Sequence, residues 1–325
     1  MIRYLVRRLL ILVVTILVAV TAMFGLLHAS PSSPVNNLPP AVAADPEIRA
    51  AVMAEKGLDR PLVVQYGRYL RDLATGDLGS SLYDGSSVWQ AIAATAPVSF
   101  ELGAMATVIA VIPGIALGIA SARRHGRPFD GGSRLVTVLA ISLPSYWLAV
   151  LCLVVVGERY PDLLPRAGGF PSFVDDPVGN LQAIVLPALV LGLAAFAMIA
   201  RSLRTSLVEI YDGDDVRFAR AMGMSERHIL TRIALRNAAP ATITVAGLLI
   251  GGLVSGTVLV ENVFQLPGLG QLMVLAFVRQ DYPLALGTAL ATAVIFLGLN
   301  LIVDLAVVAF DPRTRQRMAQ AEAST

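Results

Sequence analysis

The sequence is poor in charged residues and in the residue types that build disulfides or metal sites. Charged residues make up 15% of its 325 residues, against about 25% in typical soluble proteins, whereas hydrophobic residues make up 56%. The one cysteine, Cys152, cannot form an intrachain disulfide, and a net charge of +2 does not favour a nucleic-acid partner. With a mean hydropathy of +0.70, these values exclude a disordered chain and a disulfide scaffold. They indicate a protein that lies in lipid.

The usual sequence signals of a catalytic or metal site are missing too. No G-x-x-x-x-G-K-[ST] phosphate-binding loop occurs in the chain. The three histidines, His28, His125 and His228, do not have the spacing of metal ligands. No serine has the histidine and aspartate partners that a hydrolase would need. We therefore expect no catalytic site, no metal and no bound cofactor in this chain.

Six long apolar stretches predict transmembrane helices. A helix needs about 20 apolar residues to cross the hydrocarbon core, and continuous rather than alternating runs favour helices over a β-barrel. The first stretch follows three arginines, as in a signal peptide, but it is too long for one and lacks a good cleavage site, so we expect it to be retained. The predicted spans are Leu9–Leu27, Val98–Ala122, Leu135–Val156, Ala183–Ala200, Ala241–Val260 and Leu284–Phe310.

The distribution of basic residues predicts the orientation of these spans. With the N-terminus inside, the cytoplasmic segments carry 17 Lys and Arg residues and the external segments carry 8. Because Lys and Arg are enriched on the cytoplasmic side of membrane proteins, we expect both termini to be cytoplasmic. The predicted divisions are 1–28 (cytoplasmic tail and first span), 29–97 (external loop subdomain), 98–310 (five-helix core) and 311–325 (cytoplasmic tail).

The external loop 29–97 has a helical pattern of its own. Asp45 is expected to cap a helix that ends at Gly57. Apolar residues then recur at helical spacing over 62–73, and Gly76 ends this second helix. Two interpretations stay open: a small cap packed on the bundle, or a docking surface for a soluble partner.

The cytoplasmic segment 201–240 carries seven Arg and five acidic residues, so its charge is nearly balanced. Acidic residues around Asp215 favour the N-terminus of a short helix, and Gly223 fits a left-handed stop. Ser225 is expected to cap a second helix, and Pro240 is expected to begin the next span. The pattern predicts a short helix, a glycine turn and a second helix facing the cytoplasm.

Only two acidic residues fall inside the predicted spans, Glu101 and Asp304. Neither lies near the middle of its span. An ion-coupled secondary transporter would need a polar site near the membrane midplane and inverted repeats, and neither is recognisable here. Such a transporter or channel therefore stays only as the alternative from a different class. A purely structural membrane scaffold would not account for the helix–glycine–helix segment.

The segment from Asp215 to Leu235 resembles the coupling-loop motif of ABC importer permeases. That motif reads E-A-A-x3-G-x9-I-x-L-P, and Gly223, Ile233 and Leu235 keep its spacing. Arg217 stands at the glutamate position and Arg236 at the final proline position, and this variant resembles the R-x-A-R-A-x-G form of the dipeptide, oligopeptide and nickel permeases. By this resemblance, the residues that couple to an ATPase are Asp215, Arg217, Phe218, Ala219, Arg220, Ala221, Gly223, Ile233 and Leu235.

Further segments resemble the same family along nearly the whole chain, and they match its first-subunit type with the long external loop. They are Gly57–Leu62, Gly76–Ser81, Pro144–Leu148, Glu261–Phe264, Pro267–Gly270 and Asp281–Pro283. From the segment before the last span we expect residues of an external gate or docking surface. These candidates are Glu261, Phe264, Pro267, Gly268, Gly270 and Asp281.

The resemblance implies an all-α integral membrane protein with the six-helix architecture of type I ABC importer permeases and a partly helical external loop. It implies a permease half without ATPase activity in the bacterial cytoplasmic membrane. The implied partners are a second homologous permease, two cytoplasmic ATPase subunits that bind ATP and Mg, and an extracytoplasmic substrate-binding protein. Peptides are the expected substrates, while nickel, haem, glutathione or an oligosaccharide remain open within the family.

Overall fold

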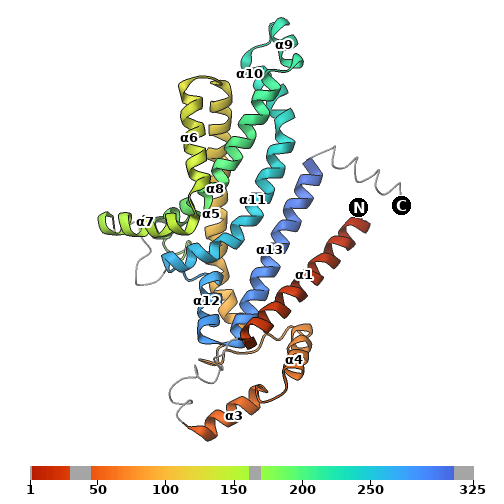
Figure 1. The fold of residues 1–325 in the computed structure, drawn as a ribbon, viewed down its shortest axis with the longest axis vertical. Coiled ribbons are helices and arrows are strands. Elements are labelled where there is room, and N and C mark those ends of the chain that lie inside the picture. The colour runs from red at the N-terminus through yellow and green to blue at the C-terminus, as the bar shows by residue number, and fades with distance from the viewer. Residues whose placement is uncertain (1, 30–44, 161–169, 311–325) are drawn as a thin grey trace. The chain divides into compact units, whose positions relative to one another are not determined.

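The computed structural model describes residues 2–29, 45–160 and 170–310, which form helices and one isolated antiparallel bridge between Ser80 and Ser87 (Figure 1). One segment, η3, is a π-helix. In chain order the elements are α1 (Ile2–Ala29), α3 (Pro46–Lys56), α4 (Leu62–Ala74), α5 (Val88–Arg123), α6 (Pro128–Ser142), α7 (Ser145–Arg159), α8 (Pro177–Tyr211), α9 (Asp214–Ala221), α10 (Glu226–His228), η3 (Ile229–Ala234), α11 (Leu235–Phe264), α12 (Leu269–Arg279) and α13 (Tyr282–Phe310).

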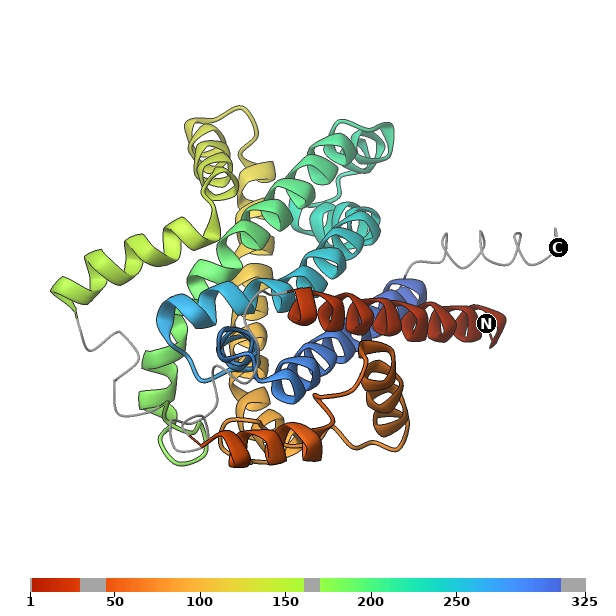
Figure 2. The same cartoon turned by 60° about the horizontal axis from the view of Figure 1, so that its bottom comes forward.

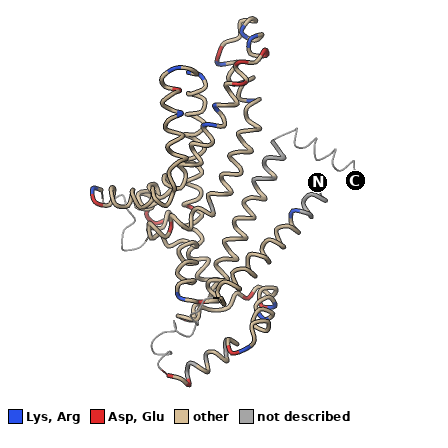
Figure 3. Tube along the Cα trace, in the orientation of Figure 1, with Lys and Arg blue, Asp and Glu red and all other residues tan. Residues whose placement is uncertain are grey.

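The described residues form two compact units. The first comprises the described part of Met1–Ser99 together with Gln265–Leu297, and the second comprises the described part of Phe100–Phe264 and of Gly298–Thr325. Helices α5 and α13 contribute residues to both units. Charged residues lie mostly at helix ends and in connecting segments, and the long helices are apolar between them (Figure 3). This distribution is typical of helices that lie in lipid.

Five described helices are long and apolar enough to cross a membrane: α1, α5, α8, the helix that includes most of α11, and α13. They confirm five of the six predicted spans. Helix α5 has 36 residues and α8 has 35, so each is about 50 Å long, whereas the hydrocarbon core is about 30 Å thick. Both helices therefore extend well beyond the lipid, and the end of α8 lies in the charged segment 201–240.

The prediction of one continuous third span over Leu135–Val156 is wrong. The chain forms two helices there, α6 and α7, which are bent by 98° relative to each other. Pro144 explains the break: it has no amide hydrogen, and it pushes the preceding Leu143 into an extended conformation with φ −87° and ψ 121°. The break keeps its hydrogen bonds, because Leu143 N donates to Leu139 O and Leu148 N donates to Pro144 O.

Pro240 was expected to begin the fifth span, and this prediction is also wrong. The helix capped by Ser225 continues without interruption through η3 into α11, and Pro240 lies inside α11. A π-helix accommodates an extra residue in a helical run, and a proline in a membrane helix is tolerated where side chains satisfy the backbone.

In the first unit, the two helices predicted within 29–97 are confirmed as α3 and α4. Glu47 N donates to Asp45 Oδ1 at 2.9 Å at the start of α3, and Gly57 and Gly76 adopt φ of 68° and 81° after the two helices. A small apolar core joins this segment to α1, α12 and α13. Its buried members are Leu27, Ala276, Tyr282, Ala285 and Leu286, and Leu58, Tyr69 and Leu82 pack against it.

In the second unit, α8 packs against α6 and α11 and crosses α5 (Figure 2). Glycines allow the close approach of α5 and α8. A Cβ added to Gly118 would lie 2.9 Å from Ala200 O, and one added to Gly192 would lie 2.7 Å from Ala106 O. Small residues of this kind are the usual means by which membrane helices pack tightly.

We predict that Gly118→Ala lowers the thermal stability of the purified protein. The new methyl group meets the backbone of α8, so the helices must move apart, at a cost of about 1–3 kcal/mol. Gly103→Ala on the same helix is the matched control, because a Cβ there has nothing within 4 Å. Melting curves in detergent measure both variants. Equal melting temperatures for the two would show that the α5–α8 contact is not as close as described.

Candidate functional site

Helix α9 is the short helix that the sequence predicts within 201–240. It begins at Asp214 and Asp215, whose charges favour a helix N-terminus. It ends in a Schellman motif, in which Met224 N donates to Ala219 O at 3.1 Å and Gly223 N donates to Arg220 O at 3.0 Å. Gly223 has the predicted left-handed conformation, with φ 79°. The direction in which the chain leaves α9 is thus set by one glycine.

The next helix starts where predicted. Ser225 Oγ accepts a hydrogen bond from His228 N at 3.4 Å and caps α10. Ile229, the first residue of η3, is fully buried against Val216 and Ala219 of α9, which are 0% and 3% exposed. Three partly buried residues complete this cluster: Ile210, Tyr211 and Ile233. Burial of one face therefore holds α9 against the end of α8 and the start of η3.

The opposite face of α9 and the turn after it are exposed. Phe218 is 69% exposed, Met222 66% and Met224 44%. Asp215, Arg217 and the small residues Ala221 and Gly223 are exposed as well. The site thus presents an apolar patch, Phe218, Met222 and Met224, surrounded by charges.

Arg220 has a partner within the chain. Its Nε donates to Glu226 Oε1 at 2.7 Å, and its guanidinium lies 5.8 Å from the centroid of the Tyr211 ring. The hydrogen bond from Arg220 lowers the pKa of Glu226 below its ordinary value. The pair is half exposed, so it contributes little stability; its effect is to connect α9 to α10 across the glycine turn.

Ile233 and Leu235, the last two residues of the predicted coupling set, are partly buried. Ile233 packs on the cluster under α9. Leu235 packs on a second cluster that joins α8 to η3 and the start of α11, formed by Ala122, Leu203, Leu207, Leu230, Ala234 and Ala238. The structure therefore divides the predicted set. Ala219, Ile233 and Leu235 support the site from below, whereas Asp215, Arg217 and Phe218 are on its surface.

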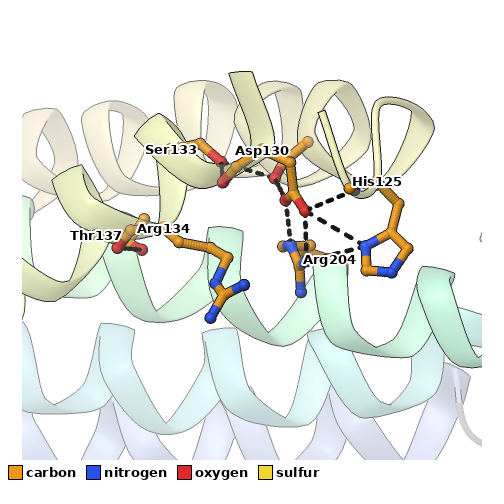
Figure 4. A network of polar contacts seen from close by, with 8 residues as sticks. His125, Asp130, Ser133, Arg134, Thr137 and Arg204 are labelled. Atoms are coloured by element: carbon orange, nitrogen blue, oxygen red, sulfur yellow. Dashed lines mark hydrogen bonds and ion pairs between the residues drawn. The ribbon is translucent and has the colours of Figure 1, made fainter. Parts of the chain in front are cut away.

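A buried polar network around Asp130, which the sequence did not predict, lies between α5, α6 and α8 (Figure 4). Asp130 is 2% exposed. Arg204 donates to both carboxylate oxygens, from Nε at 2.6 Å and from Nη2 at 2.7 Å. Ser121 Oγ donates to the same carboxylate at 2.6 Å, and Gly126 N donates at 3.2 Å. Arg204 is the main reason why the pKa of Asp130 lies far below its ordinary value.

The predicted external residues fall in both units. In the second unit, Glu261 and Phe264 are 0% and 3% exposed. In the first unit, Pro267 is exposed, and Gly268 and Gly270 are buried. Of these five residues, only Pro267 is exposed.

Asp281 is buried as well, with 2% of its surface exposed. Its carboxylate accepts hydrogen bonds from Ser81 Oγ at 2.5 Å and from Leu82 N at 3.1 Å. It also accepts from Leu284 N at 3.4 Å, in the first turn of α13. Asp281 thus fixes the segment before α5 to the start of α13, which is a structural role.

Comparison with known protein families identifies the chain. Residues 114–316 match the family described as binding-protein-dependent transport system inner membrane component, and residues 1–103 match the N-terminal region described for such membrane components. The chain belongs to this family of transport-system components. It is a multi-pass inner-membrane permease subunit of a binding-protein-dependent ABC importer, as the resemblance implied. The match favours this assignment over the ion-coupled alternative.

Individual relatives agree with the family. The permease is 38% identical to a protein of Brucella abortus named as a peptide transport system permease, over 84% of this chain and 86% of the other. It is 31% identical to the dipeptide transport system permease protein DppB of Escherichia coli, over 98% and 100% of the two chains. Its fold resembles a chain of the MetNI methionine ABC transporter, with a TM-score of 0.54, 19% identity and coverage of 68% and 97%. This likeness confirms the predicted fold class.

The Asp130 network of the permease had a signal in the sequence. Residues 123–134 contain four arginines and only one acidic residue, Asp130. A single acid in a basic connecting loop is a candidate for an ion pair. Its partner could not be found in this way, because Arg204 is separated from Asp130 by 74 residues.

We predict that Gly223→Val uncouples the transporter while the chain still inserts in the membrane. A valine at φ 79° strains the turn by about 1–3 kcal/mol, and this misdirects α9. Substrate-stimulated ATPase activity of the assembled transporter measures the effect. Gly223→Asn is the matched control, because asparagine tolerates the left-handed conformation, and it should retain most of the stimulation. Full stimulation in Gly223→Val would rule out a role for this turn.

We predict that Asp130→Asn lowers stability by about 3 kcal/mol, because it leaves Arg204 without its charged partner in a nearly buried site. The control, Asp212→Asn, removes the same charge from an exposed position at the end of α8. Asp130→Asn should therefore melt at a clearly lower temperature than Asp212→Asn.

The pH dependence of the Asp130 contribution follows from the lowered pKa. The carboxylate stabilises the fold above the ordinary aspartate pKa of about 4, and this stabilisation is lost as pH falls through the folded-state value. The difference in the free energy of unfolding between Asp130→Asn and the native chain should thus stay constant from about pH 6 to pH 8. A difference that shrinks across this range would contradict the ion pair.

Proposed function

We propose that this chain forms half of a translocation pathway for peptides, together with a second homologous permease. Two cytoplasmic ATPases that bind ATP and Mg supply the energy, and an extracytoplasmic binding protein delivers the substrate. The observation that carries the proposal is the arrangement of α9, which is held on one face by its own chain and is exposed on the other. The names of the relatives from Brucella abortus and Escherichia coli support peptides as the substrate.

The exposed face of α9 suits an ATPase subunit. Phe218, Met222 and Met224 lie outside the predicted spans, where lipid does not cover them. Apolar patches of this kind mark interaction sites, and aromatic residues and methionine are enriched in protein interfaces. A rigid helix that is seated on α8 and η3 can transmit the movement of a partner to the membrane helices as a rigid-body shift. The seven arginines and five acids of 201–240 nearly cancel, which favours a protein partner over lipid headgroups.

The external segment is proposed to receive the binding protein. Leu62, Val63 and Val64 at the start of α4 are 53%, 83% and 40% exposed, so α4 offers an apolar edge beside the charged helix α3. The acids of the predicted external segments outnumber the bases, 13 to 8, and this charge can steer a basic partner.

A cap that only stabilises the unit is the competing interpretation. Deletion of Asp45–Gly57 from the assembled transporter separates the two, because only loss of a docking surface removes stimulation by the loaded binding protein.

The substrate is tested by isolating the cognate binding protein and identifying the compounds that copurify with it. Peptides are expected. Nickel, haem, glutathione or an oligosaccharide in their place would overturn the substrate assignment and leave the family assignment intact. ATP-dependent uptake of the identified compound into vesicles that contain the transporter then completes the test.

We predict that Phe218→Ala weakens ATPase binding and lowers substrate-stimulated ATPase activity by about tenfold. Truncation of a central aromatic anchor costs about 1–3 kcal/mol in an interface, and a cost of about 1.4 kcal/mol is a factor of ten. The matched control is Phe129→Ala, which removes an aromatic residue that is 43% exposed at the start of α6. Copurification of the ATPases with each variant measures binding. Normal copurification with Phe218→Ala would exclude α9 as the docking helix.

From the count of basic residues, we predict that α9 and the turn after it lie on the cytoplasmic side of the membrane. Single cysteines at Ser86 and Ser225, both exposed, are introduced in a Cys152→Ala background. An impermeant thiol reagent applied to intact cells should label position 86 and spare position 225. The reverse pattern would invert the orientation.

A further inference from the structure

A cavity of about 380 Å³ lies beside the Asp130 network in the second unit. It opens between α5, α6 and α8, and its lining is basic at one end and apolar at the other. The lining side chains include three arginines, Arg134, Arg201 and Arg204, together with His125. No acidic residue lines it, and Asp130 is the acidic residue of the adjoining network.

The positive charge of this cavity is only partly compensated. Both oxygens of Asp130 are bound by Nε and Nη2 of Arg204, so this carboxylate offsets one guanidinium. Arg134 and Arg201 form no ion pair with any residue that the structure describes. Figure 4 shows Arg134 extending from α6 towards α8, on the side where Arg204 lies. Cations gathered in one cavity repel each other unless an anion lies between them.

The polar wall of the cavity is held in place before any ligand arrives. Ser121 Oγ and Ser133 Oγ are 2.7 Å apart, and Ser133 Oγ donates to Asp130 O at 2.9 Å. The bond from Ser121 ties the Asp130 carboxylate, on α6, to α5, and the bonds from Arg204 tie it to α8. Arg204 is fixed in this way, whereas Arg134 and Arg201 are exposed and make no bond to Asp130. The fork of an arginine matches phosphate oxygens.

The other end of the cavity is suited to hydrocarbon. Leu117, Val138 and Ala200 line it, and it continues onto an exposed apolar face of α6. On this face Leu135, Val136, Val138 and Leu139 are between 49% and 60% exposed. On α6 these exposed apolar residues follow directly after the predicted cytoplasmic loop 123–134, so they suit acyl chains, whereas Arg134 is the last residue of that loop.

We propose that this cavity binds the phosphate headgroup of an anionic phospholipid from the cytoplasmic leaflet, with its acyl chains along α6. Arg134 and Arg201 bind the phosphate, and Arg204, held by Asp130, forms the back wall. A free phosphate would satisfy the arginines, but it would leave the apolar end and the α6 face unused, which favours the lipid. Basic pockets between membrane helices on the cytoplasmic side are suited to such headgroups. The site is independent of the transported substrate.

The test uses the assembled transporter, delipidated in a non-ionic detergent and titrated with phosphatidylglycerol. Native mass spectrometry counts the bound lipid and gives an apparent Kd. Arg134→Gln with Arg201→Gln should weaken binding by at least about tenfold, since each lost charge-assisted bond costs more than 1 kcal/mol. The matched control is Arg124→Gln with Arg127→Gln, which removes two charges from the same connecting loop but outside this cavity. It should bind phosphatidylglycerol like the native chain.

Two further ligands distinguish the source of the phosphate. Phosphatidylcholine with the same acyl chains should bind weakly to every variant, because its headgroup has no net charge. Inorganic phosphate should not displace the lipid at comparable concentrations. Equal weakening in the two double variants would overturn the site. Displacement by inorganic phosphate would overturn the lipid assignment, and binding that appears only after removal of the ATPases would identify the cavity as part of a subunit interface.

Discussion

The burial of Val216 and Ala219 against Ile229 is the contact on which the α9 site depends. Helix α9 has only eight residues, and isolated helices of this length are not stable in water. Its own chain must therefore hold it, and the left-handed turn at Gly223 brings η3 back underneath it. Once one face is buried in this way, the opposite face carries Phe218 and Met222 as a rigid patch. The same contact fixes the direction of the patch relative to α8.

Much of this site could be predicted from the sequence because its determinants are local. Acids at a helix start, a glycine at its end and a serine cap act over a few residues, and Asp215, Gly223 and Ser225 each have the predicted role. The hydrophobic runs likewise predict the spans, since lipid permits little besides helices. The helices α3 and α4 follow from the same local signals, whereas the predicted span Ala183–Ala200 covers only the middle of α8 (Pro177–Tyr211).

The remaining features depend on contacts between distant residues or on competing local effects. Asp281 reads as a surface residue in the sequence, and only its bond to Ser81, 200 residues away, shows that it is buried. Asp130 and Arg204 are similarly distant. Proline has two outcomes: Pro144 breaks a span, whereas Pro240 lies inside α11. A hydrophobic run does not show which of the two outcomes a proline will have.

Hydrogen–deuterium exchange over 214–229 tests the central claim most directly, when the permease pair is compared with the fully assembled transporter. The account predicts that the amides of α9 are already protected without the ATPases, because its buried face rests on its own chain. On assembly, exchange around Phe218 and Met222 should slow further, since the exposed patch becomes covered. Full exchange of α9 in the absence of the ATPases, or no change on assembly, would contradict a preformed docking helix.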